Sequence, residues 1–201
     1  RAAGGFAAGL LPFAAALVAG GRPFFDGVFG YKGYAGEWGI GLLLDAAARF
    51  PRWGNEAAAA HAWFVGSGGR AALLAAVAAV AALAWAFRRR WTPYQVAALV
   101  LATFMVVTPG FAVQYLAFPL AAVMAADRGR GVAYGVWAGA CCGVVYGGYW
   151  TGTYPAQSLF KYGLPPPAPM LGFVAWAVLF GFVARTLLSP RTPPADARHR
   201  P

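Results

Sequence analysis

Long apolar runs alternate along this chain with short segments that are polar, basic or rich in glycine and proline. A helix needs about 20 mainly apolar residues to cross a bilayer, and about six runs approach that length once tilt and boundary error are allowed for. The pattern predicts an all-α fold, a polytopic transmembrane helix bundle with a large outward loop after the first span. The expected spans cover residues 6–20, 71–87, 91–108, 111–126, 132–149 and 170–188.

A break at Pro109-Gly110 separates the third expected span from the fourth. As one helix, residues 91–126 would extend about 54 Å, too long for a bilayer core about 30 Å thick. Proline and glycine interrupt helices, so two spans joined by a tight break fit better. Gln114 and Tyr115 are then expected near the start of the returning helix, close to one membrane face. They either contact a polar ligand there or form an interfacial tyrosine and a satisfied amide in a plain helix hairpin.

The composition agrees with a membrane protein. Hydrophobic residues make up 60% of the chain and charged residues 11%, whereas soluble domains carry about 25% charge. The net charge of +10 does not point to nucleic acid, because the basic residues form short clusters between apolar runs. Such clusters orient polytopic proteins in membranes, with the positive loops in the cytoplasm. We therefore expect a multi-pass protein of the cell membrane with the lipid bilayer, not nucleic acid, as its partner.

The arginine clusters predict the orientation. Placing the 88–90 cluster in the cytoplasm puts the 127–131 loop and the tail from residue 189 on the same side, with the C-terminus cytoplasmic. Residues 1–188 then form a single transmembrane domain, and the basic, proline-rich residues 189–201 form a disordered cytoplasmic tail. The large polar loops are expected outside, together with four of the six acidic residues, Asp26, Glu37, Asp45 and Glu56.

The first outer loop is the most varied polar segment. It combines the cations Arg22 and Lys32, the carboxylates Asp26 and Glu37, and several aromatic residues, among them Tyr31 and Trp38. Cations hold phosphate groups, and aromatic faces suit sugar rings or the lipid interface. An ordinary aromatic belt at a membrane face explains the same composition.

Shorter elements are expected between this loop and the second span. Residues 40–50 predict an interfacial amphipathic helix with an Asp45–Arg49 pair at i, i+4, and residues 56–65 predict a second short helix. Residues 66–69 read as a flexible link. In the fifth span, Gly135, Gly139 and Gly143 recur every four residues, a spacing that predicts close helix packing.

The cysteine and histidine residues predict no metal site, and no motif predicts a cofactor. Whether a divalent metal takes part stays open. Cys141 and Cys142 are adjacent in an apolar run, so they are poorly placed to bond each other and are expected to be small buried side chains. His61 and His199 lie far apart in the chain. The last outer loop again joins aromatic residues to one cation, Lys161.

Two segments together carry a family resemblance. Arg22-Pro23-Phe24, Tyr31-Lys32-Gly33-Tyr34 and Glu37-Trp38-Gly39-Ile40, followed later by Thr108-Pro109-Gly110-Phe111-Ala112-Val113-Gln114-Tyr115-Leu116, resemble bacterial polytopic glycosyltransferases. The similarity is to the GT-C superfamily, especially glycosyltransferase family 87 and mannosyltransferase-like membrane proteins, and covers roughly residues 21–126. It implies transfer of a mannose-like hexose or a pentose from a polyprenyl-phosphate donor to a glycan or lipid acceptor on the extracytoplasmic face.

The resemblance also implies site residues. Such transferases need a base for the acceptor hydroxyl and cations for the departing phosphate. Members of this superfamily usually have more spans and a catalytic aspartate near the N-terminus, so the chain resembles their C-terminal part. Either Asp26 or Glu37 is the base, or the main base belongs to a preceding segment. The implied substrate-binding residues are Arg22, Tyr31, Lys32, Trp38, Gln114, Tyr115 and Lys161.

Two other functions stay open. In a small-molecule transporter or permease component, a broken helix such as the one at Pro109-Gly110 lines the substrate path. Neither an internal repeat nor a charge near the middle of a span supports that function. A non-catalytic membrane scaffold is the third alternative.

Overall fold

The computed structural model describes residues 14–15, 18–22, 34–87, 91–152 and 167–188. The chain divides into two compact units, residues 1–33 and 34–201. In the first unit, the described residues are helical and exposed, and most of the first expected span lies outside the described residues.

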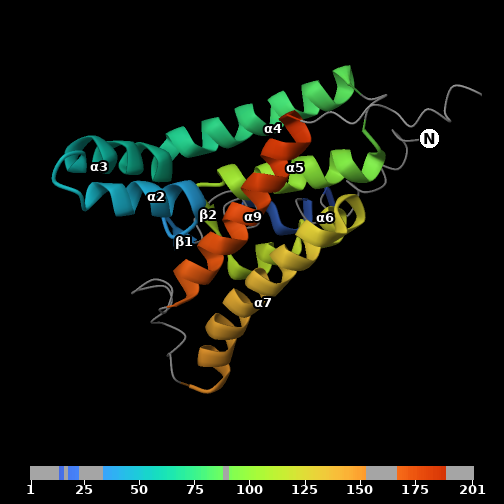
Figure 1. Ribbon diagram of the computed structural model, residues 1–201. Coiled ribbons are helices and arrows are strands. Elements are labelled where there is room, and N and C mark those ends of the chain that lie inside the picture. Colours follow the sequence, from blue (N-terminus) through green and yellow to red (C-terminus); the bar gives the residue numbers. More distant parts are fainter. Residues whose placement is uncertain (1–13, 16–17, 23–33, 88–90, 153–166, 189–201) are drawn as a thin grey trace, which may run out of the picture. The chain divides into compact units, whose positions relative to one another are not determined.

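In the described residues of the second unit, the regular elements are helices apart from one pair of two-residue strands, which confirms the all-α prediction (Figure 1). Its elements are β1 (Tyr34–Ala35), α2 (Gly39–Ala48), α3 (Gly54–Trp63), the π-helical turn η1 (Phe64–Gly68), α4 (Gly69–Ala86), α5 (Pro93–Val107), β2 (Gly110–Phe111), the 3₁₀ helix η2 (Val113–Ala117), α6 (Leu120–Ala126), α7 (Arg128–Trp150) and α9 (Ala168–Leu188). Within the described residues, two helical stretches are long and apolar enough to cross a membrane, Gly54–Ala86 and Ala168–Leu188.

Local sequence explains where the helices begin. Thr92 and Gln95 form a capping box at the start of α5: the Thr92 hydroxyl accepts from the Gln95 N–H at 3.3 Å, and the Gln95 side chain accepts from the Thr92 N–H at 2.9 Å. Pro93 occupies the first helical position, where no N–H is needed. Asp127 caps α7, because its Oδ1 accepts from the Arg130 N–H at 3.1 Å.

The short elements after the first loop agree with the sequence. Residues 40–50 and 56–65 correspond to α2 and α3, which lie side by side in Figure 1. Arg49 and Asp45 form the expected ion pair at 2.7 Å. The predicted link at residues 66–69 corresponds to a kink within η1, where the non-helical residue Gly66 separates two helices. Its flexibility remains a prediction. Glycine suits this kink because it has no Cβ to restrict its backbone conformation.

The expected span over residues 111–126 is not one continuous helix. It consists of β2, η2 and α6, and the last of these has seven residues. Pro119 is the physical reason for the second interruption, since it has no N–H to donate to the carbonyl of Tyr115. Tyr115 instead accepts a 3₁₀-type bond of 3.0 Å from the Phe118 N–H, and α6 begins after Pro119.

The core lies among α5, α6, α7 and α9, with the start of α2 inserted into it. Its largest fully buried side chains include Trp38 and Tyr134, whose hydroxyl donates to the Leu116 carbonyl at 2.6 Å. A second cluster joins α4 to α5 through Val80, Ala84, Trp91 and Leu99.

Helix α7 packs on a different face from the one expected. Its buried residues Tyr134, Ala138, Cys141 and Val145 follow the helical period toward the core. Gly139 and Gly143 have open space where a Cβ would stand, so the predicted packing along the glycine stripe is wrong for the described residues; only Gly135 is close to a neighbour, Leu120. The aromatic and branched side chains face the core in place of the glycines, because they bury far more apolar surface than glycine does. Cys141 is buried and Cys142 half-buried, both as free thiols, in agreement with the sequence.

Candidate functional site

The first outer loop meets the break between α5 and η2. Strands β1 and β2 pair antiparallel, with Tyr34 opposite Phe111 and Ala35 opposite Gly110. The pairing continues one residue further, because the Gly36 N–H donates to the Pro109 carbonyl at 3.2 Å. The described part of the first segment that carries the family resemblance, from residue 34, is therefore adjacent in space to the second segment. We call this contact of residues 34–38 with residues 105–114 the hairpin junction.

Two tryptophans complete the end of α5 at the hairpin junction. In a continuing helix the Met105 carbonyl would accept from the N–H of residue 109, but that residue is proline and has none. Instead, Trp38 Nε1 donates to the Met105 carbonyl at 2.5 Å. Trp176 Nε1 of α9 donates to the next carbonyl, that of Val106, at 2.9 Å. Both bonds are buried, so they satisfy carbonyls that would otherwise lack partners in the core.

Glycines make this close approach possible. Gly39 has a left-handed φ of +50°, and a Cβ there would overlap the Trp176 indole. A Cβ on Gly41 would lie 2.8 Å from the Cα of Gly36. The start of α2 can therefore lie directly against α9 and against the paired strand only because these positions have no side chain.

The predicted residues at the hairpin junction differ in their surroundings. Glu37 is half-buried between Gly36 and Trp38. Trp38 is 1% exposed with its N–H bonded to Met105, so its indole is part of the core and not an exposed platform for a sugar ring. Gln114 is exposed and accepts from the Tyr146 hydroxyl at 3.4 Å. Tyr115 is half-buried with its ring centroid 5.2 Å from that of Phe118.

The structure does not describe where the other predicted residues lie relative to the hairpin junction. Asp26, Tyr31, Lys32 and Lys161 lie outside the described residues, and Arg22 is an exposed helical residue of the first unit. Their roles remain predictions. Among the described residues, no three His, Cys, Asp or Glu side chains are grouped closely enough to hold a metal ion.

His61 is a residue at the hairpin junction that the sequence did not single out. Its Nε2 atom is buried and has no hydrogen-bond partner among the described residues. A Cβ built on Gly36 would lie 2.5 Å from that atom, so the imidazole contacts the residue next to Glu37. A single histidine in an alanine-rich helix forms no sequence pattern that would relate it to Glu37. Only the packing of α3 against the strand reveals it.

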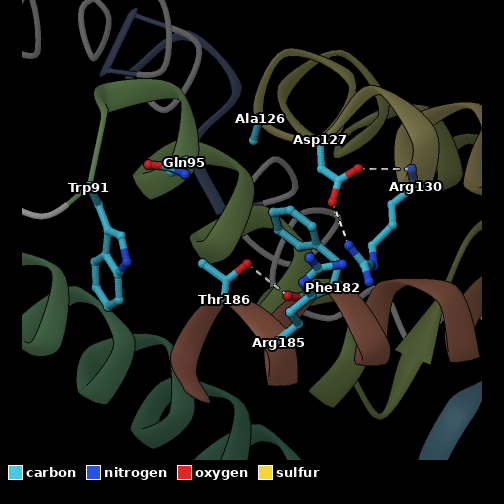
Figure 2. A pocket seen from close by; sticks show the side chains of 8 residues that line it. All are labelled: Trp91, Gln95, Ala126, Asp127, Arg130, Phe182, Arg185 and Thr186. Carbon is cyan, nitrogen blue, oxygen red and sulfur yellow. Dashed lines mark hydrogen bonds and ion pairs between the residues drawn. The ribbon is translucent and has the colours of Figure 1, made fainter. Parts of the chain in front are cut away.

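The opposite end of the same helices contains a cavity of about 150 Å³ (Figure 2). We call it the arginine pocket. The start of α5, the α6–α7 connection and the end of α9 contribute its eight lining residues, Trp91, Gln95, Ala126, Asp127, Arg130, Phe182, Arg185 and Thr186. These are the chain segments next to the three basic regions that the sequence assigns to one side of the membrane.

Asp127 and Arg130 form an ion pair in the arginine pocket, drawn with dashed lines in Figure 2. Burial by itself would raise the pKa of Asp127. The Arg130 backbone N–H, the Arg130 guanidinium and the charge of Arg185 together outweigh it, so the pKa lies below the ordinary value of 3.8. The carboxylate is therefore ionised at neutral pH and holds the Arg130 guanidinium in place.

The chain matches no protein-family model, no curated protein sequence and no solved structure.

Proposed function

We propose that this chain is a membrane glycosyltransferase, or the C-terminal part of one, that moves a mannose-like hexose or a pentose from a polyprenyl phosphate to a glycan or lipid acceptor. The observation that supports it is the pairing of β1 with β2. The described parts of the segments that resemble GT-C transferases are separated in sequence by the four helices α2, α3, α4 and α5, and they meet at the hairpin junction. The residues of the junction and their neighbours include a carboxylate, Glu37, and an amide, Gln114; the His61 imidazole contacts Gly36, and the Tyr146 phenol donates to Gln114.

Membrane embedding is part of the proposal. Helix α4 exposes large apolar side chains, with Trp85 74% and Leu74 72% exposed, as expected for a helix that faces lipid. We propose the six crossings of the sequence analysis, with residues 111–126 as a broken returning limb. The hairpin junction then lies toward the extracytoplasmic face and the arginine pocket toward the cytoplasm, as the positive-inside rule favours.

The proposed chemistry is a direct displacement. Glu37 or Asp26 takes the proton of the acceptor hydroxyl as its oxygen bonds to the anomeric carbon, and the polyprenyl phosphate leaves with the electron pair of the broken bond. His61, which lies against Gly36, is a further proton acceptor within the junction. Arg22, Lys32 and Lys161 are the proposed cations for the departing phosphate. Gln114 and Tyr115 are the proposed partners of the sugar hydroxyls.

The test is sugar transfer from polyprenyl-phosphate hexose and pentose donors by membranes that contain the natural full-length protein. We would compare the Asp26→Asn, Glu37→Gln, His61→Gln and Gln114→Ala variants, with Glu56→Gln as control, since Glu56 is an exposed carboxylate of α3. Loss of transfer in one of the four variants, with normal membrane insertion and normal transfer by the control, supports the proposal. Absence of transfer by the unaltered protein from every such donor overturns it.

The break at Pro109 is the observation that would favour a transporter, in which unwound backbone carbonyls bind the solute. In this protein the carbonyls of Met105 and Val106 already accept from buried indoles. Both carbonyls are therefore already satisfied by buried protein donors, so internal packing accounts for the break without a bound solute. For this reason the transferase is the better supported function.

A further inference from the structure

We propose that the arginine pocket binds the phosphate of an anionic lipid headgroup. The inference uses the proposed membrane embedding but not the transferase activity, so either can fail without the other. It concerns the end of the bundle away from the hairpin junction.

The charges in the pocket favour an anion. Arg130 and Arg185 contribute two positive charges, and Asp127 offsets one of them. A guanidinium has five N–H donors, so Arg130 retains donors after it binds Asp127. Arg185 affects Asp127 through its charge, but it forms no ion pair with that carboxylate among the described contacts. The pocket therefore holds one uncompensated guanidinium beside a second that is fixed in position.

Neutral donors and helix ends add to this charge. The side-chain oxygen of Gln95 is occupied by the capping box, which leaves its NH₂ group as the end that can donate. Helices α5 and α7, of 15 and 23 residues, both begin at the pocket. Helix N-termini carry partial positive charge, which stabilises a bound anion.

The remaining lining limits the ligand. Trp91, Ala126 and Phe182 are apolar, and the Thr186 hydroxyl already donates to the Phe182 carbonyl at 2.8 Å. At about 150 Å³ the cavity is smaller than the roughly 300–1,000 Å³ of pockets that enclose a whole drug-sized ligand. The phosphate of an anionic lipid fits this description, because only the headgroup enters and the chains stay in the bilayer. Basic pockets between membrane helices bind anionic headgroups in this way.

The experiment follows the thermal unfolding of the purified full chain in a neutral detergent. Short-chain phosphatidic acid and phosphatidylglycerol are titrated in parallel with phosphatidylcholine of the same chain length and with inorganic phosphate. The variant is Arg185→Gln. The matched control is Arg70→Gln, since Arg70 is also exposed but lies at the start of α4, next to the hairpin junction.

We expect the anionic lipids, but not phosphatidylcholine, to raise the midpoint of unfolding of the unaltered protein. In Arg185→Gln the lipid concentration needed for half of that shift should rise roughly tenfold, the effect of losing one charge-assisted hydrogen bond. Arg70→Gln should respond as the unaltered protein does. An equal shift with inorganic phosphate overturns the lipid assignment, because free phosphate is then sufficient. The site is overturned if neither the anionic lipids nor inorganic phosphate shifts the midpoint of unfolding. It is also overturned if Arg185→Gln and Arg70→Gln lose the lipid response equally.

Discussion

The indole N–H of Trp38 donates to the carbonyl of Met105 across 2.5 Å, in the place where Pro109 provides no helical donor. One residue along, Trp176 does the same for Val106 at 2.9 Å. A proline that ends α5 is thus compensated by indoles from the start of α2 and from α9. The two bonds connect elements that are far apart in sequence, and they hold the hairpin junction together.

Replacing Trp38 with Phe should destabilise the protein by about 1–3 kcal/mol, because a buried carbonyl is left without a donor. The free energy of unfolding in detergent micelles measures the effect. Trp53→Phe is the matched control, since Trp53 is 58% exposed and its replacement should change stability by less than about 0.5 kcal/mol. Equal effects of the two substitutions would show that the Trp38 bond does not stabilise the fold.

Replacing Gly39 with Ala should be strongly unfavourable. The left-handed backbone alone costs a residue with a Cβ roughly 1–2 kcal/mol, and the new Cβ overlaps the Trp176 indole. Gly139→Ala is the control, because the space beside Gly139 is open and alanine favours a helix by up to about 1 kcal/mol. Thermal unfolding of both variants checks the prediction, and it fails if Gly39→Ala melts at or above the temperature of the unaltered protein.

Stability should depend on the ionisation of Asp127. Its pKa in the folded protein lies below 3.8, so the folded state binds this proton more weakly than the unfolded chain does. The stabilisation is complete above the unfolded pKa and is lost as the pH falls from about 4 through the lower folded pKa. Denaturant unfolding between pH 3 and pH 7 measures it.

Two substitutions separate the charge of Asp127 from its role as a helix cap. Asp127→Asn keeps a good capping residue and should remove the acid-sensitive part of the stability. Asp127→Ala should lower the free energy of unfolding by about 1 kcal/mol more than Asp127→Asn does, the usual cost of removing an N-cap residue. An Asn variant with the unaltered acid dependence would assign that dependence to another group.

Labelling of introduced cysteines tests the proposed orientation. In a Cys141→Ala, Cys142→Ala background, Asn55→Cys on α3 should react with a membrane-impermeant maleimide in intact cells. Arg128→Cys at the start of α7 should react only after the membrane is opened. Both positions are exposed, so access and not burial decides the result. The reverse pattern would invert the proposed topology.

Sequence alone was sufficient for features whose cause lies within a few residues. Proline at 109 ends α5, and Asp45 and Arg49 pair one turn apart. The all-helical class followed from apolar run length. The prediction of one span over residues 111–126 was wrong because it did not take Pro119 into account. This proline divides the segment into η2 and α6.

Long-range packing decided the rest, since no local pattern encodes which distant groups meet. Gly135, Gly139 and Gly143 have the spacing of a packing face, but the larger side chains of Tyr134 and Cys141 bury more surface and turn α7 the other way. The contact of His61 with Gly36, the pairing of Tyr34 with Phe111 and the three helix ends around Arg130 each depend on the whole bundle. The sequence by itself determined the helical class and the break at Pro109, because backbone geometry and hydrogen bonding act locally. Only the tertiary structure decided which polar groups share a site, because that depends on how all the helices fill the core at once.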